Sequence, residues 1–151
     1  PRRWVGKAEV ERGQGLLGRA IAVAFRFPAA GSEVPVTVVK RPVGDGEVWE
    51  RRFGAGRFRS RLGARRGRLV ERFGPLAFDM QLQVRDGALH WPVVAGRCLG
   101  LPLPRWVLPR VVAREEADAG RFRFHVEMHA PFAGGLIVAY RGWLAAAGAD
   151  G

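Results

Sequence analysis

Three side chains that could bind a metal ion alternate along one stretch of the sequence, at His125, Glu127 and His129. If this stretch is a strand, all three project from one face, with neighbours about 6–7 Å apart. Two imidazoles and a carboxylate could hold a metal if a neighbouring strand supplied a fourth ligand. They lie opposite the apolar residues of the same stretch, which places them on the solvated face. We therefore expect an exposed polar stripe and no metal.

Other reactive residue types occur without a recognisable catalytic pattern. His90 has no Ser or Cys nucleophile placed with it by a motif, and an isolated histidine of this kind is expected to be structural. Cys98 adjoins Leu99 and is expected to be a small buried hydrophobe, whereas Glu71 and Asp79 stand on opposite sides of a proline. We predict no catalytic residue and no cofactor, and the sequence favours a protein that is not an enzyme.

A run of arginines carries the strongest local charge. The formal net charge is +11, and between Arg51 and Arg68 lie eight arginines and no acid, so the rest of the chain is nearly balanced. Such a stripe could bind the phosphates of nucleic acid, lipid headgroups or a dinucleotide. The favoured interpretation is a solvated strand face in an arginine-biased sequence, with anion contact as the alternative. The candidate anion-binding residues are Arg57, Arg59, Arg61, Arg65, Arg66 and Arg68.

The elements that would position these side chains are one helix and a series of short strands. Apolar residues recur at helical spacing over 15–27, and Pro28 ends the pattern. Asp86-Gly87 joins alternating runs over 77–84 and 88–94, which is a strong hairpin signal. The other expected strands span 4–12, 34–41, 47–53, 57–62, 68–73, 110–116, 121–130 and 135–144.

Several of these runs have one apolar and one polar face. Phe78, Met80, Leu82 and Val84 alternate with polar residues, and Phe122, Phe124, Val126 and Met128 do the same. A sheet with one apolar face must cover it by curling or by packing on a helix. The predicted fold class is α+β, mainly β: a curved antiparallel sheet or incomplete barrel of about eight or nine strands packed on one helix.

A proline-rich apolar segment interrupts the strands between Cys98 and Arg110. Prolines at 102, 104 and 109 remove ladder donors and favour an extended backbone. We expect this segment to lie across an open end of the sheet, either as a core-sealing plug, which is favoured, or as the lid of an apolar pocket. The candidate pocket and lid residues are Phe78, Met80, Leu82, Leu101, Leu103, Trp106, Phe122, Phe124 and Met128.

Length and composition indicate one globular domain over 1–151. The chain has 151 residues, 48% of them hydrophobic and 26% charged, which excludes the disordered class. No apolar run is long enough to span a bilayer and no secretory signal is visible, so a cytoplasmic location is expected. Pro1 is not an initiating residue, which suggests a domain excised from a longer chain. Residues 145–151 are expected to form a frayed tail.

Four stretches together resemble a known family: "WERRFGAGRFRS" (49–60), "ERFGPLAF" (71–78), "GLPLPRWVLP" (100–109) and "APFAGGLIVAYRGWL" (130–144). They resemble the bacterial family catalogued as domain of unknown function 4166. This resemblance implies an accessory domain, often C-terminal to saccharopine-dehydrogenase-like or short-chain-dehydrogenase-like NAD-binding domains, with no established catalytic residues. No GxGxxG follows a strand, so any nucleotide site would lie on such a partner.

Three functions follow, in order of preference. The first is a non-enzymatic accessory or binding domain that holds a lipid-like hydrophobic small molecule in the concave face of the sheet. The second is an interaction domain that docks on an NAD-dependent oxidoreductase through its arginines. The third and weakest is nucleic-acid binding, because no RNA-recognition signature is present.

Overall fold

The computed structural model describes residues 1–148, which form one large antiparallel sheet and one α-helix, α1 (Leu16–Ala24). A short 3-10 helix, η1 (Arg105–Val107), follows the tenth strand. None of the helices in this part of the chain is long and apolar enough to cross a membrane. The strands are β1 (Arg2–Arg12), β2 (Gly31–Val43), β3 (Gly46–Phe53), β4 (Gly56–Arg65), β5 (Arg68–Phe73), β6 (Leu76–Met80), β7 (Gln83–Arg85), β8 (Ala88–His90), β9 (Val93–Cys98), β10 (Leu101–Pro102), β11 (Arg110–Asp118), β12 (Arg121–His129) and β13 (Leu136–Ala146).

The predicted class, mainly β with an antiparallel sheet and one helix, is confirmed, but the strand count is wrong. The sheet has 13 strands within residues 1–148, in the order β10-β9-β6-β5-β4-β3-β2-β1-β13-β12-β11-β8-β7. Two additional strands arise because each run of the central hairpin is divided in two, and a third is the short β10 in the proline-rich segment. Pro92 has no N–H to donate to a ladder, and the breaks after Met80 and after His90 let the hairpin change partners.

This divided hairpin connects the two ends of the strand order. Its tip pairs with β11 through β8, whereas its base, the β6–β9 pair, adjoins β5 through β6. Only Trp91 and Pro92 separate β8 from β9. The sheet therefore closes on itself through two residues of chain, and the turn at Asp86 and Gly87 has the positive φ at both positions that the sequence predicts.

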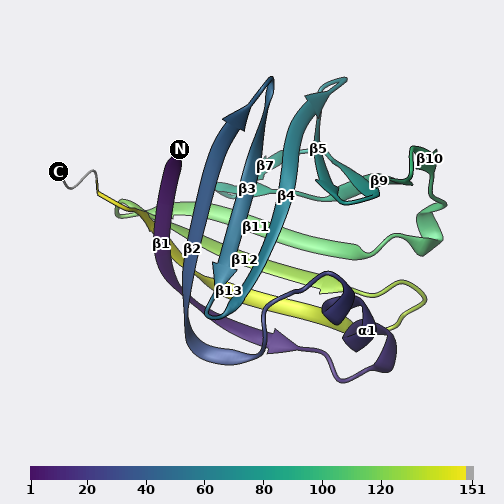
Figure 1. Cartoon of the computed structure of the whole chain (residues 1–151), viewed down its shortest axis with the longest axis horizontal. Helices are drawn as coiled ribbons and strands as arrows, with labels where there is room; N and C mark the ends of the chain where they lie inside the picture. Colours follow the sequence, from purple (N-terminus) through teal and green to yellow (C-terminus); the bar gives the residue numbers. More distant parts are fainter. Residues whose placement is uncertain (149–151) are drawn as a thin grey trace.

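The two halves of the sheet cross steeply, with β2 to β5 in front of β11 to β13 (Figure 1). β1 and β13 join the halves, and a glycine from each lies where their backbones come closest. A Cβ on Gly6 would press against the carbonyl group of Trp143, and one on Gly142 would lie 2.8 Å from the Cα of Ala8. Glycine at these two positions permits the close approach that bends the sheet.

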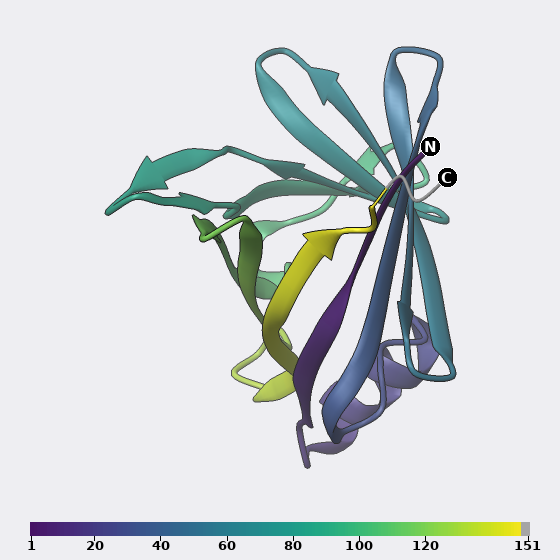
Figure 2. The ribbon, with the colours of Figure 1, turned by 90° about the vertical axis from the view of Figure 1, so that its left-hand side faces the viewer.

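Helix α1 covers one end of the curved sheet, opposite the tips of the β2–β3 and β4–β5 hairpins (Figure 2). Its buried Ala22 belongs to a core cluster with Phe27, Val36, Ile137 and Val138, among others. The helix is shorter than the predicted 15–27 because Arg26 takes a φ of 55° and ends it. Arg12 then holds the following chain, donating from Nε to the Pro28 carbonyl at 2.7 Å.

The predicted faces hold for one alternating run and fail for part of the other. Phe122, Phe124, Val126 and Met128 lie on the inner face and line the cavity described below, although Phe122 is 47% exposed. Leu82 and Val84 do not line this cavity, and their exposed fractions are 44% and 78%. The ladder is irregular at the end of β6, so the chain beyond Met80 leaves the β6–β9 pair and the predicted alternation no longer applies.

The proline-rich segment lies along the outer end of the barrel beside β9. Leu101 and Trp106 are 71% and 66% exposed, so they neither plug nor cover the interior. Leu108 is the residue that turns inward, because its side chain occupies the space above Gly96 where any Cβ would clash. The segment therefore seals the edge of the sheet through one leucine.

The C-terminal part of the chain is more ordered than expected in its first residues. Ala145 and Ala146, placed in the predicted tail, belong to β13 and pair with Val5 and Trp4. Residues 149–151 of that predicted tail lie outside the described residues.

Candidate ligand-binding cavity

The half of the barrel away from α1 contains a cavity of about 330 Å³. Its floor is formed by Val36, Phe53 and Tyr140, which also belong to the packed core or contact it. Arg2 and Trp4, near the N-terminus, contribute to the opposite end. The interior is therefore packed against the helix at one end and hollow at the other.

The structure brings together only part of the predicted pocket. Met80, Phe122, Phe124 and Met128 line the cavity. Phe78 faces inward from β6 but lies beyond its wall. Leu82, Leu101, Leu103 and Trp106 do not line it, so the proline-rich segment is not its lid.

Sequence reasoning missed the charged side chains that also face inward. Residues paired across neighbouring strands point to the same face, and Arg51 pairs with Val38 on β2 and with Phe58 on β4. Both of those neighbours are buried. Arg51, which the sequence suggested was part of the exposed arginine run, is therefore an interior residue.

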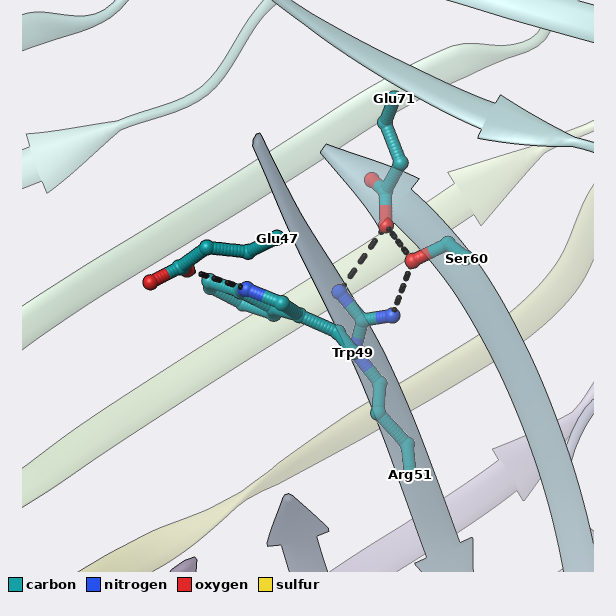
Figure 3. Close-up of polar contacts among 5 residues, drawn as sticks. All are labelled: Glu47, Trp49, Arg51, Ser60 and Glu71. Atoms are coloured by element: carbon teal, nitrogen blue, oxygen red, sulfur yellow. Dashed lines mark hydrogen bonds and ion pairs between the residues drawn. The ribbon is translucent and has the colours of Figure 1, made fainter. Parts of the chain in front are cut away.

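Arg51 is held by partners from the next two strands (Figure 3). Its Nη1 donates to Ser60 Oγ at 2.8 Å and its Nη2 lies 3.0 Å from Glu71 Oε1. The Ser60 hydroxyl donates to the same carboxylate oxygen at 2.6 Å. The side chains of Arg51 and Glu71 are each 14% exposed, so this is a largely desolvated ion pair with its hydrogen bonds satisfied.

Trp49 is the centre of the polar side of the cavity. Lys40 Nζ lies 3.6 Å from the centroid of its ring and 4.8 Å from that of Trp4, as in a cation–π arrangement. The indole N–H of Trp49 donates to Glu47 Oε2 at 2.7 Å, and this bond lowers the pKa of Glu47 (Figure 3). The other carboxylate oxygen of Glu47 lies 2.7 Å from Arg2.

Burial changes the proton affinity of three groups on the cavity wall. It raises the pKa of Glu115, an effect that Lys40 and Arg51 partly oppose. It lowers the pKa of Lys40 and raises that of Tyr140 to about 12. The interior therefore disfavours charge wherever a group has no close partner of opposite sign.

One buried donor on the wall has no acceptor. Among the described residues, Trp91 Nε1 is the one buried side-chain nitrogen or oxygen without a hydrogen-bond partner. Its ring lies 6.2 Å from that of Trp49, at an angle of 66°. An orphaned buried N–H costs free energy, and groups of this kind often mark the place of an absent ligand or water.

The predicted arginines lie on the opposite side of the sheet from the cavity. Arg57, Arg59 and Arg61 alternate with the buried residues of β4, and Arg65, Arg66 and Arg68 surround the turn into β5. All six are exposed. Of these, Arg57 lies 3.9 Å from Glu50. Arg57, Arg59, Arg61 and Arg65 share the outer face of β4, and Arg68 pairs with Arg65 at the start of β5.

The His125–Glu127–His129 stripe is also on the outer face. Glu127 bridges the two histidines, at 3.1 Å from His125 Nε2 and 3.4 Å from His129 Nε2, and these contacts lower its pKa. Residues 1–148 contain no group of three or more side chains arranged to hold a metal ion. Asp79 is likewise an outer-face residue and pairs with Arg97 at 2.9 Å, away from Glu71.

The solved structures that are similar to this chain in outline include the following two. One is an abundant heat soluble (SAHS) protein from Ramazzottius varieornatus, with 8% identity, a TM-score of 0.47, and coverage of 95% of this chain and 92% of that chain. The other is Echinococcus granulosus fatty-acid-binding protein 1, with 9% identity, a TM-score of 0.43, and coverage of 93% and 92%. No curated protein matches the sequence.

The sequence stretches that resembled a known family lie throughout this barrel. They include β3 and β4, which supply Trp49, Arg51 and Ser60, and β13, which supplies Tyr140. The model of one family matches residues 2–144, almost the whole described chain. The protein belongs to this family, which is described as a domain of unknown function (DUF4166).

Proposed function

We propose that this chain is a non-enzymatic binding protein that holds a lipid-like or other hydrophobic small molecule in the barrel cavity. The observation that carries the proposal is the hollow half of the interior. Its volume of about 330 Å³ lies at the lower end of the range for small-molecule sites, and its wall is mainly apolar with a few inward polar groups. Both features are typical of binding pockets.

The apolar part of the wall comes from both halves of the sheet. Val36 and Val38 of β2 face Val126 and Met128 of β12 across the cavity, and Met80 adds a flexible side chain. A ligand that buried its apolar surface here would gain about 25 cal/mol for each Å² removed from water. A chain-like molecule would fit between the two layers.

The test is mass spectrometry of an organic extract of the purified protein, prepared at high salt. A stoichiometric apolar compound is the expected result. A matched pair of variants gives the control, because Ala113 lines the cavity and Val112 points out of the same strand with 47% exposure. Ala113→Phe should empty the extract, and Val112→Phe should not. An extract that is empty for the unmodified protein, which also binds no added amphiphile, would overturn the proposal.

We propose as a second function that the outer arginines contact an acidic surface or a phosphate, for example on an NAD-binding oxidoreductase domain. The observation in its favour is that six exposed arginines share one surface and only Glu50 pairs with one of them among the described residues. Arginine suits such contacts because its planar guanidinium binds two oxygens at once.

Heparin binding at increasing salt tests whether these arginines form a site. A triple Gln variant of Arg59, Arg61 and Arg65 should flatten the salt dependence. The control is a triple Gln variant of three other exposed arginines, Arg85, Arg105 and Arg110. Equal losses from both variants would mean that only the net charge matters, and would contradict a specific surface.

A further inference from the structure

The charged residues that line the cavity are nearly, but not completely, paired with one another. Arg2 lies 2.7 Å from Glu47, and Arg51 lies 3.0 Å from Glu71. The remaining two are Lys40 on β2 and Glu115 on β11, which face the same cavity from different halves of the sheet. Within residues 1–148, neither of them has an oppositely charged group inside 4 Å.

Lys40 is therefore a half-buried cation that lies against two indole rings. The faces of Trp4 and Trp49 attract its ammonium group, but they accept no conventional hydrogen bond from it. An ammonium group has three N–H donors. The Lys40 side chain thus presents donors to the cavity without a hydrogen-bond acceptor in contact with them.

Trp91 adds a second unsatisfied donor next to the same indole. Lys40 Nζ is 3.6 Å and the Trp91 ring 6.2 Å from the centroid of the Trp49 ring. Both groups lie on the wall of one cavity, and Trp91 Nε1 is fully buried without an acceptor. An anionic group of the ligand beside Trp49 would supply the acceptor that the Lys40 ammonium group lacks, in the part of the cavity that also contains the Trp91 indole.

Glu115 does not fill this role itself. It lies too far from Lys40 to form an ion pair, and burial raises its pKa, which favours the neutral carboxyl. Lys40 therefore keeps an ammonium group with no carboxylate within 4 Å among the described residues, whereas Arg2 and Arg51 each have one. A ligand carboxylate would supply that missing partner, and it is the smallest common anionic head group on an apolar chain.

We propose that the ligand carries a single carboxylate, which binds inside the cavity between Lys40 and Trp91 while its apolar chain lies against the walls of β2 and β12. This inference rests on the proposed binding function and specifies the ligand class. It places the charged head inside the barrel, on the polar side formed around Trp49.

The test compares dodecanoate with dodecanol, two probes with the same chain and different heads, using calorimetry and the fluorescence of the cavity tryptophans. The unmodified protein should bind the acid about tenfold or more tightly than the alcohol, because hydrogen bonds to charged groups contribute about 1.5–3 kcal/mol. Lys40→Met should remove this preference by weakening the acid alone. Lys40→Arg should keep the preference, because it retains the positive charge.

Two further variants separate this role from a structural one. Lys7, the other lysine of the chain, is on the outer face and half exposed, so Lys7→Met should leave both affinities unchanged. Glu115→Gln should tighten the acid and not the alcohol, because it removes a competing negative charge. A merely structural role for Lys40 would change both probes equally.

The two proposals can fail separately. If both probes bind with equal affinity and Lys40→Met changes neither, the carboxylate inference is wrong and the binding function stands. If Ala113→Phe, which fills the cavity, leaves dodecanoate binding intact, the acid binds elsewhere and the inference is also overturned. If neither probe binds and the organic extract is empty, the binding function itself fails.

Discussion

Arg51 and Glu71 meet inside the barrel although their strands, β3 and β5, are not neighbours. Arg51 Nη2 lies 3.0 Å from Glu71 Oε1, and Ser60 on the intervening β4 bonds to both residues. The contact therefore links three consecutive strands from the inner face. It makes the wall of the cavity a polar network and fixes the guanidinium group in place.

Removal of one member of this pair should be costly. Glu71→Gln leaves the buried Arg51 charge without a counter-ion, so we expect the free energy of unfolding to fall by about 3 kcal/mol. The double variant Arg51→Met/Glu71→Leu should recover most of this loss, because it buries no charge. Urea denaturation measures all three proteins. A loss below about 1 kcal/mol for Glu71→Gln, typical of surface pairs, would contradict a desolvated pair.

The Glu115 carboxyl should make stability depend on pH. Burial raises the folded-state pKa of Glu115, whereas in the unfolded chain the pKa is about 4.3. The folded protein therefore keeps this proton to a higher pH than the unfolded chain does. The stability that Glu115 contributes is complete below that pH and is lost as the pH rises through the folded-state pKa. The free energy of unfolding of Glu115→Gln should therefore exceed that of the unmodified protein at neutral pH and equal it at about pH 4.

Urea denaturation at both pH values measures this difference. Glu116→Gln is the matched control, because Glu116 is the next residue, faces outward and pairs with Arg114 at 3.1 Å. Its effect should stay within about 1 kcal/mol. A Glu115→Gln variant that is less stable at neutral pH would show that the ionised carboxylate has a stabilising partner.

The glycine in β13 should be irreplaceable. Gly142→Ala would place a Cβ 2.8 Å from the Cα of Ala8, and backbone cannot move aside as a side chain can. We expect a loss of about 3 kcal/mol or failure to fold. Gly63→Ala is the control, because nothing lies within 4 Å of its Cβ. Thermal unfolding that shows similar effects for both would refute the close strand crossing.

The proline-rich segment should depend on Leu108 and not on its tryptophan. Leu108 is half-buried above Gly96, whereas Trp106 is 66% exposed. Leu108→Ala should lower the free energy of unfolding by about 1–2 kcal/mol. Trp106→Ala should change it by about 0.5 kcal/mol or less and should not alter ligand binding. A large loss of binding in Trp106→Ala would restore the lid interpretation.

The sequence predicted the local features of this protein well. Alternation placed Phe122 and Met128 on the inner face, and Asp86-Gly87 formed the expected turn. These features depend on residues that are near one another in the chain, whose periodicity and conformational preference are visible directly. The outward arginines of β4 followed from the same periodicity.

The inward charges could not be read from the sequence. In "GEVWERRF", apolar residues occur on both faces, with Val48 on one and Trp49 on the other, so alternation does not say which face is inside. That choice depends on the pairing of β3 with β2 and β4, which buries Trp49 and Arg51 together. When a strand is apolar on both faces, its pairing with the neighbouring strands decides which face points inward.

The hollow interior and the unpaired position of Lys40 within it were decided by the tertiary structure alone. Lys40 and Glu115 are far apart in the chain and come to one cavity only when the hairpin of β6 to β9 joins the two ends of the sheet. The sequence by itself determined the strands, the helix and a concave apolar face. Whether that face was filled or hollow depended on how far apart the curved sheet holds its two halves, because side-chain volume fills only the space that the backbone leaves.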